Sequence, residues 1–217
     1  MRTILCYGDS NTWGYDPAAT ASSPFPVRHS HDARWTAVLA RELGAEYRIV
    51  EEGQNGRTTA HDDPTAMACR NGRKALPTIL ESQKPIDIVV LMLGTNDFKT
   101  MFNLPAADIA NSVAVLVKIL LLSDAGPDGK APRVLLVAPP AIGDLSHLPD
   151  LDARLAGARE KSLQLPRYYA ATAKQLGISF VSAQDFVQPS RIDGIHLDCS
   201  ELEKLGRGIA AAVKAMA

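Results

Sequence analysis

The run from Ile86 to Leu93 constrains the fold of this chain more than any other segment. Seven of its eight residues are apolar, and the exception is Asp87 near its start. A strand that is apolar at consecutive positions has to be covered on both faces, as a central strand of a parallel sheet is. The run therefore predicts an α/β fold in which helices cover both faces of a parallel sheet.

Strand and helix patterns alternate along the rest of the chain. Further strands are predicted at residues 4–6, 47–50, 133–138 and 178–181. Helices are predicted at residues 32–43, with Asp32 as the N-cap, at 73–83 and 105 to about 124, in a segment that ends at Leu176, and from Ser200 onwards. Such alternation is typical of a parallel sheet with helices on both faces. No repeat or linker interrupts the pattern, so we expect one domain over residues 1–217.

The composition excludes several classes of partner. The chain has 217 residues, of which 46% are hydrophobic and 22% are charged, and its net charge is -1. Without an excess of basic residues it lacks the electrostatic field that attracts nucleic acid or an anionic membrane. No apolar run reaches the roughly 18 residues that span a bilayer. No signal peptide precedes the first predicted strand, so we expect a cytoplasmic protein.

Neither the cysteines nor the histidines form a metal-binding pattern. The three cysteines are scattered along the chain, and their spacing fits neither a disulfide framework nor a C-x-x-C metal site. His29 and His31 lie beside Asp32, but their polar surroundings favour a solvated loop over a metal site. The sequence therefore predicts no metal ion.

Loops that carry polar side chains follow four of the predicted strands. Ser10 follows the first strand, Gly56 the second and Asn96 the third. Asp193 and His196 share a loop after the last strand. Because all strands of a parallel sheet point the same way, these loops should meet at its carboxyl edge, where open α/β sheets bind ligands.

These residue types suit nucleophilic catalysis by a serine. The hydroxyl of Ser10 can attack an acyl carbonyl once a base removes its proton, and His196 is the natural base. Asp193 lies three positions before His196, so its carboxylate can accept the Nδ1 proton and fix the tautomer. The backbone amides of Ser10 and Gly56 and the side-chain amide of Asn96 are candidate donors to an oxyanion.

Four sequence blocks that contain these residues resemble those of the SGNH, or GDSL-type, hydrolases. The blocks are Gly8–Asn11, the glycine of Asn55–Thr59, Gly94–Asp97 and Asp193–His196, and they occur in the family's order. The resemblance implies a three-layer α/β/α sandwich with a flavodoxin-like, five-stranded parallel sheet. It also implies ester hydrolysis through an acyl-serine intermediate, without a cofactor. It assigns the catalytic triad to Ser10, Asp193 and His196. It assigns the oxyanion hole to Ser10, Gly56 and Asn96.

A closer resemblance is to the bacterial arylesterase/acyltransferase branch of these hydrolases. It rests on Thr12–Gly14, Glu51–Gly53, Arg57–Thr59, Asp62–Pro64 and Met92–Asp97. The residues predicted to bind substrate are then Asn11, Trp13 and Tyr15. Asn11 stands where the transesterifying member of the branch has an apolar residue, and Tyr15 replaces an indole, so both should make the pocket more polar. Relatives in this branch assemble into homo-oligomers, which predicts a homo-oligomer by analogy.

The sequence thus predicts a serine esterase whose partner is a small-molecule ester with a short acyl chain, an acetyl or aryl ester for example. Two alternatives keep the same triad, namely an acyltransferase and a carbohydrate deacetylase. A third is a non-catalytic, flavodoxin-like binding module. It is disfavoured because the first loop is neither a G-x-x-x-x-G-K-S/T nor a G-x-G-x-x-G phosphate-binding motif.

Two segments of the second half carry structural expectations. Residues 141–156 form an irregular segment that is longer than a simple connection needs, and it is either a lid over the site or an interface element. Pro166 lies within the helical pattern that ends at Leu176. It is expected to kink or divide that helix because proline removes an amide donor and crowds the preceding turn.

Overall fold

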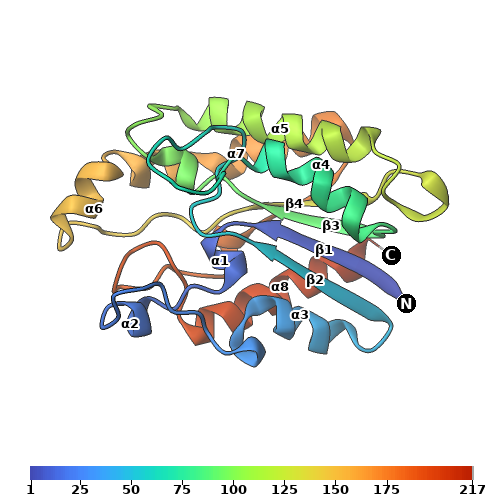
Figure 1. Ribbon diagram of the computed structural model, residues 1–217, viewed down its shortest axis with the longest axis horizontal. Helices are drawn as coiled ribbons and strands as arrows, with labels where there is room; N and C mark the ends of the chain where they lie inside the picture. Colours follow the sequence, from blue (N-terminus) through green and yellow to red (C-terminus); the bar gives the residue numbers. More distant parts are fainter. Residues whose placement is uncertain (217) are drawn as a thin grey trace.

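A computed structural model describes residues 1–216 and contains a five-stranded parallel sheet (Figure 1). The strands are β1 (Arg2–Gly8), β2 (Tyr47–Gly53), β3 (Ile88–Met92), β4 (Arg133–Ala138) and β5 (Ser179–Ser182). Their order across the sheet is β2-β1-β3-β4-β5, and every neighbouring pair is parallel. This is the flavodoxin-like strand order, and it confirms the predicted fold class.

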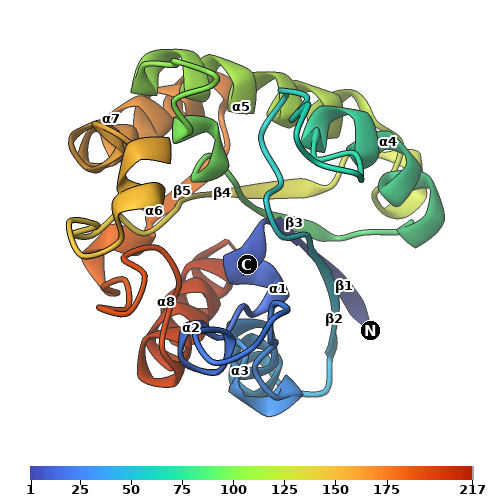
Figure 2. The same ribbon diagram turned by 60° about the vertical axis from the view of Figure 1, so that its left-hand side comes forward.

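Helices cover both faces of the sheet and make it the middle of three layers (Figures 1 and 2). One face carries α4 (Gly72–Gln83), α5 (Ala106–Leu122) and α7 (Ala158–Leu176). The other face carries α3 (Trp35–Leu43) and α8 (Cys199–Ala215), which pack against each other. None of the helices in residues 1–216 combines the length and the apolar composition that crossing a bilayer requires.

Side chains along each strand alternate between the two apolar layers. In β1, Leu5 and Tyr7 belong to the layer under α5 and α7, whereas Ile4 and Cys6 belong to the layer over α3 and α8. All five residues of β3 are buried, as the apolar run of this segment predicts. Because the side chains of a strand point alternately to opposite faces, only a strand that is apolar at every position can fill both layers.

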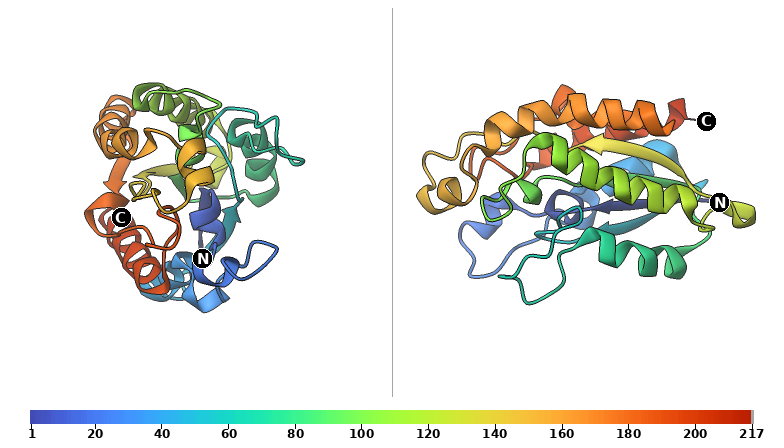
Figure 3. Two further views of the ribbon diagram at one scale, coloured as in Figure 1. Left: turned by 90° about the vertical axis from the view of Figure 1, so that its left-hand side faces the viewer. Right: turned by 90° about the horizontal axis from the view of Figure 1, so that it is seen from above.

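Short helices lie beyond the carboxyl edge of the sheet, which faces the viewer in the left panel of Figure 3. They are α1 (Ser10–Trp13), α2 (Pro17–Thr20) and α6 (Pro149–Arg154). The segment 141–156, predicted to be irregular, therefore contains a helix of six residues. A Cβ added to Gly53 at the end of β2 would lie 2.1 Å from the backbone nitrogen of Trp13. α1 thus packs directly on the end of β2, where no larger residue fits.

Pro166 does not divide the helix, because α7 continues through it from Ala158 to Leu176. Proline cannot donate to the carbonyl four residues earlier, which here belongs to Ser162. That carbonyl accepts a hydrogen bond of 2.9 Å from Nε2 of Gln184 instead. A side chain from outside the helix therefore satisfies the group that Pro166 leaves without its helical donor.

Candidate active site

Ser10 is the first residue of α1, and a single residue, Asp9, separates it from the end of β1. Asp9 caps this helix, and its Oδ1 accepts a hydrogen bond of 3.0 Å from the backbone nitrogen of Asn11. A side-chain acceptor at this position satisfies an amide that the helix itself leaves without a partner. The strand, the cap and the short helix together hold the hydroxyl of Ser10 at the carboxyl edge of the sheet.

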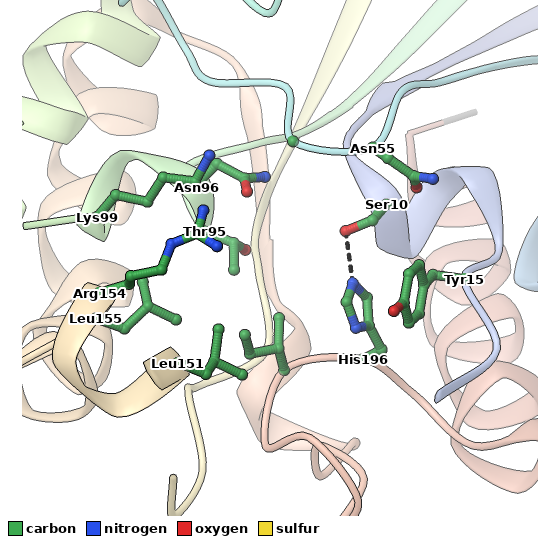
Figure 4. Close-up of a pocket in the computed structure, with 12 residues that line it drawn as sticks. Ser10, Tyr15, Asn55, Thr95, Asn96, Lys99, Leu151, Arg154, Leu155 and His196 are labelled. Carbon is green, nitrogen blue, oxygen red and sulfur yellow. Dashed lines mark hydrogen bonds between the residues drawn. The ribbon is translucent and has the colours of Figure 1, made fainter. Parts of the chain in front are cut away.

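Ser10, His196 and Asp193 form a continuous chain of hydrogen bonds. Nε2 of His196 lies 2.8 Å from Oγ of Ser10, the contact drawn as a dashed line in Figure 4. Nδ1 of His196 lies 2.6 Å from Oδ2 of Asp193. The three residues predicted as a triad therefore meet, although 186 positions separate Ser10 from His196.

The loop that carries His196 is a tight turn built on Asp193. Oδ1 of Asp193 accepts hydrogen bonds from the backbone nitrogens of Ile195 at 3.0 Å and His196 at 2.9 Å. Gly194 between them has a φ of 66°, a conformation that glycine adopts without strain. Both oxygens of Asp193 are therefore engaged, one by the turn and one by the imidazole.

Burial and hydrogen bonding have opposite effects on the ionisation of Asp193. Burial raises the pKa of its carboxyl group, but the hydrogen bonds from the side chain and backbone of His196 outweigh burial and lower the pKa below 3.8. An ionised carboxylate can only accept hydrogen bonds, so the imidazole proton resides on Nδ1. Nε2 is then left as the acceptor for the hydroxyl proton of Ser10.

Three further groups surround the hydroxyl of Ser10. Asn55 and Gly56 come from the loop after β2, and Asn96 begins the turn after β3. Nδ2 of Asn96 donates a hydrogen bond of 3.1 Å to the backbone oxygen of Arg57. Its amide group points across the cavity towards Ser10 (Figure 4). The structure thus brings together all the residues predicted to form the oxyanion hole.

A buried carboxylate joins the loops that carry Gly56 and Asn96. Both oxygens of Asp97 lie within 3.1 Å of the backbone nitrogen of Thr59, and Oδ1 also accepts from the hydroxyl of Thr59 at 2.5 Å. Asp97 is fully buried, and burial raises its pKa. Sequence reasoning assigned no role to this contact, which fixes the two loops relative to each other.

A cavity of about 220 Å³ opens beside Ser10 (Figure 4). Residues from five segments line it: Ser10, Tyr15, Asn55, Gly56, Thr95, Asn96, Lys99, Leu151, Arg154, Leu155, Ile195 and His196. Tyr15 stacks on the imidazole of His196, with ring centres 3.8 Å apart and planes inclined by 19°. The segment 141–156 contributes the wall formed by Leu151, Arg154 and Leu155, so it borders the cavity.

The three residues predicted to bind substrate occupy different positions. Tyr15 lines the cavity, but Asn11 and Trp13 do not. Asn11 is 2% exposed, and its Nδ2 donates to the backbone oxygen of Ile195 at 3.3 Å. The guanidinium of Arg28 lies over the Trp13 ring, 5.3 Å from its centre. Asn11 therefore connects the helix of Ser10 to the loop of His196 and adds no polar group to the cavity.

A comparison of the sequence with known protein families agrees with the geometry of Ser10, His196 and Asp193. Residues 6–198 match the GDSL-like lipase/acylhydrolase family. The chain belongs to this family. The match confirms the predicted relationship, and the acylhydrolase carries its predicted triad inside the matched segment.

Solved structures of esterases resemble the acylhydrolase over its whole length. A carbohydrate acetylesterase from Sinorhizobium meliloti is 40% identical, with a TM-score of 0.94 and complete coverage of both chains. The aryl esterase of M. smegmatis is 37% identical, with a TM-score of 0.93 and complete coverage of both chains. No curated protein sequence matches significantly. Family and structural neighbours together identify the acylhydrolase as an enzyme of the aryl- or acetylesterase type.

The buried carboxylate of Asp9 makes the stability of the acylhydrolase depend on pH. Asp9 is 1% exposed, and burial raises its pKa from 3.8 to about 6. Between these values the folded state binds more protons than the unfolded state, so stability falls as pH rises. Asp9→Asn keeps an acceptor for the nitrogen of Asn11 but cannot ionise. Relative to the wild type, the variant should therefore gain about 2 kcal/mol in unfolding free energy between pH 4.5 and pH 8.

Urea unfolding of both proteins at the two pH values measures this difference. Asp152→Asn, which alters an exposed carboxylate on α6, is the matched control and should show no comparable gain. The difference in unfolding free energy between Asp9→Asn and the wild type could instead stay constant from pH 4.5 to pH 8. That result would show that burial does not raise the pKa of Asp9.

Proposed function

We propose that the acylhydrolase is a serine esterase that hydrolyses small acyl esters with short chains through an acyl-serine intermediate. The observation that carries this proposal is the chain of hydrogen bonds from Asp193 through His196 to Ser10. It ends beside a cavity of about 220 Å³, which suits an acetyl or similarly short acyl group. Acetyl and aryl esters are therefore the proposed substrates.

Each group has one task in the acylation step. Nε2 of His196 takes the proton of Ser10 as Oγ attacks the acyl carbonyl, and Asp193 stabilises the imidazolium that forms. The negative charge that develops on the carbonyl oxygen faces the backbone amides of Ser10 and Gly56 and the side-chain amide of Asn96. His196 then returns the proton to the departing alcohol, and Ser10 retains the acyl group.

Water completes the reaction by the same route. His196 removes a proton from a water molecule, whose oxygen attacks the acyl-serine carbonyl. The resulting carboxylic acid leaves, and the proton returns to Oγ of Ser10. Tyr15, stacked on His196, restricts the orientation of the imidazole in both steps. No step needs a metal or an organic cofactor.

Acyl transfer to an alcohol or deacetylation of a sugar would use the same residues. The carbohydrate acetylesterase at 40% identity favours acetylated sugars as substrates worth testing. Asn11, which the sequence predicted to make the pocket more polar, is buried, and its side chain donates a hydrogen bond to the backbone oxygen of Ile195. Its polarity therefore gives no reason to prefer hydrolysis over acyl transfer, and Tyr15 alone remains as the polar substitution in the cavity.

A panel of esters tests the proposed acyl preference. Initial rates are measured for 4-nitrophenyl acetate, butyrate and octanoate, and for acetylated xylose. We expect kcat/KM to be much lower for the octanoate than for the acetate and the butyrate, because a cavity of about 220 Å³ holds only a short acyl chain. A preference for octanoate would contradict the proposed short-chain specificity.

Three other expectations remain predictions. They are a cytoplasmic location, a homo-oligomeric state and a single domain over residues 1–217. Size-exclusion chromatography with light scattering measures the oligomeric state, and a monomer at micromolar concentration would contradict the predicted homo-oligomer.

A further inference from the structure

The cavity beside Ser10 has an unusual charge balance. Apart from His196, the charged side chains that line it are Lys99 and Arg154, and both are cations. A cavity that only had to hold an acetyl group would need no such charge, because an acetyl group is neutral. The cavity therefore carries more positive charge than hydrolysis of an acetyl ester requires.

The charge of Lys99 is already balanced. Its Nζ lies 2.7 Å from Oδ2 of Asp63, and the two side chains are only 14% and 4% exposed. Burial opposes the ionisation of Asp63, but hydrogen bonds from Lys99 and Thr65 hold its pKa at about 2. Lys99 and Asp63 thus form an ionised pair of zero net charge at neutral pH.

The charge of Arg154 is not balanced within residues 1–216. No carboxylate of this part of the chain lies within ion-pair distance of its guanidinium. Its backbone is nevertheless held in place, because its carbonyl oxygen accepts a hydrogen bond of 2.9 Å from the nitrogen of Thr100. Arg154 therefore offers all of its guanidinium donors from a fixed attachment point at the end of α6.

The position of Arg154 indicates which part of a substrate it would meet. Figure 4 shows its guanidinium beside Asn96 and Lys99, on the opposite side of the cavity from His196 and Tyr15. The departing alcohol must lie next to His196 to receive a proton. The acyl group then extends towards the opposite wall, which Leu151, Arg154 and Leu155 form together.

We propose that the acyl part of the substrate carries a carboxylate at the end remote from the ester bond, and that Arg154 binds this carboxylate as a specificity-determining residue. This inference rests on the proposed esterase function. The substrates are monoesters of short dicarboxylic acids. Their methylene groups contact the leucines, and their free carboxylate faces the planar guanidinium, which can donate two parallel hydrogen bonds. Hydrolysis adds water across the ester bond and releases a dicarboxylate and an alcohol.

A matched pair of esters tests this role. Monomethyl glutarate carries a free carboxylate, and methyl 4-carbamoylbutanoate carries a neutral carboxamide of nearly the same size. Methanol release gives kcat/KM for both. In the wild type we expect the anionic ester to be preferred. In Arg154→Gln the ratio of kcat/KM for the anionic ester to that for the neutral ester should fall roughly 10- to 100-fold, the usual effect of losing a charge-assisted hydrogen bond. Arg154→Lys keeps the positive charge but loses the two parallel N–H donors of the guanidinium. Its ratio of kcat/KM values should therefore lie between those of the wild type and Arg154→Gln.

Arg159→Gln is the control, because Arg159 is an exposed arginine nearby on α7 that does not line the cavity. It should leave the ratio unchanged. An unchanged ratio in Arg154→Gln would overturn the proposal, while continued hydrolysis of 4-nitrophenyl acetate would leave the esterase function standing. A larger effect of Arg154→Gln on 4-acetoxybenzoate than on monomethyl glutarate would place the anion on the alcohol and overturn the acyl-side assignment. A wild type that hydrolyses none of these esters would overturn the esterase proposal, and this inference with it.

Discussion

Ser10→Ala is expected to reduce kcat for 4-nitrophenyl acetate by roughly 10⁴- to 10⁶-fold. The substitution removes Oγ, which lies 2.8 Å from Nε2 of His196 and is the atom proposed to attack the acyl carbonyl. It does not alter the backbone amide of Ser10, so a neutral substrate should still bind. The loss should therefore appear in kcat, and initial-rate measurements over a range of substrate concentrations separate it from any change in KM.

A fluorophosphonate probe gives an independent measurement of the same site. It should label the wild type at Ser10 and leave Ser10→Ala unlabelled. Ser200→Ala, which alters an exposed serine on α8, is the matched control and should retain both activity and labelling. Turnover of Ser10→Ala at the level of the wild type would refute the serine-esterase mechanism.

The arrangement of the triad could be predicted because it follows from strand direction. Ile86–Leu93 required a sheet that is covered on both faces, and parallel strands deliver their following loops to one edge. Ser10, Asn96 and His196 each follow a strand of this sheet, so their meeting does not depend on the details of the intervening helices. The local turn from Asp193 to His196 was also within reach of sequence reasoning, since both ends lie within three residues.

The walls of the cavity could not be predicted in the same way. Leu151, Arg154 and Leu155 belong to a segment without a clear periodic pattern, and its helix α6 spans only six residues. So short a helix depends on tertiary contacts, such as the hydrogen bond from Thr100 to the carbonyl of Arg154. The spacing of residues in the sequence does not indicate that contact. The residues of α6 that line the cavity, Arg154 among them, were therefore not predicted.

Side-chain direction was the other source of error. The resemblance to the arylesterase/acyltransferase branch predicted that Asn11, which follows Ser10 directly, binds substrate. The first turn of α1 instead directs it into the protein, towards the oxygen of Ile195. Pro166 leaves α7 undivided for a related reason, because Gln184, eighteen positions away, supplies the hydrogen bond that the helix lacks. In both cases a partner distant in sequence decides the local structure.

Asp193→Asn is expected to reduce kcat by about 10⁴-fold at pH 7, through the tautomer of His196. Two backbone amides, at 3.0 and 2.9 Å, donate to Oδ1 of Asp193. The oxygen of the new amide should keep this position, so its nitrogen takes the place of Oδ2. Nδ1 of His196 then faces a donor and must accept. The imidazole proton moves to Nε2, which can no longer take the proton of Ser10. Initial rates measure the effect, with Asp198→Asn in the neighbouring turn as the exposed control.

Asp193→Ala separates the tautomer from the charge. Alanine removes the carboxylate but places no donor opposite Nδ1, so water can support either tautomer of His196. If the wrong tautomer dominates the loss, Asp193→Ala should retain more activity than Asp193→Asn, even though alanine also removes the hydrogen bonds that shape the turn. Equal losses in the two variants would show instead that the negative charge beside the imidazolium is the main contribution of Asp193. Retention of more than a tenth of wild-type kcat in Asp193→Asn would contradict the assignment of Asp193 as the residue that orients His196.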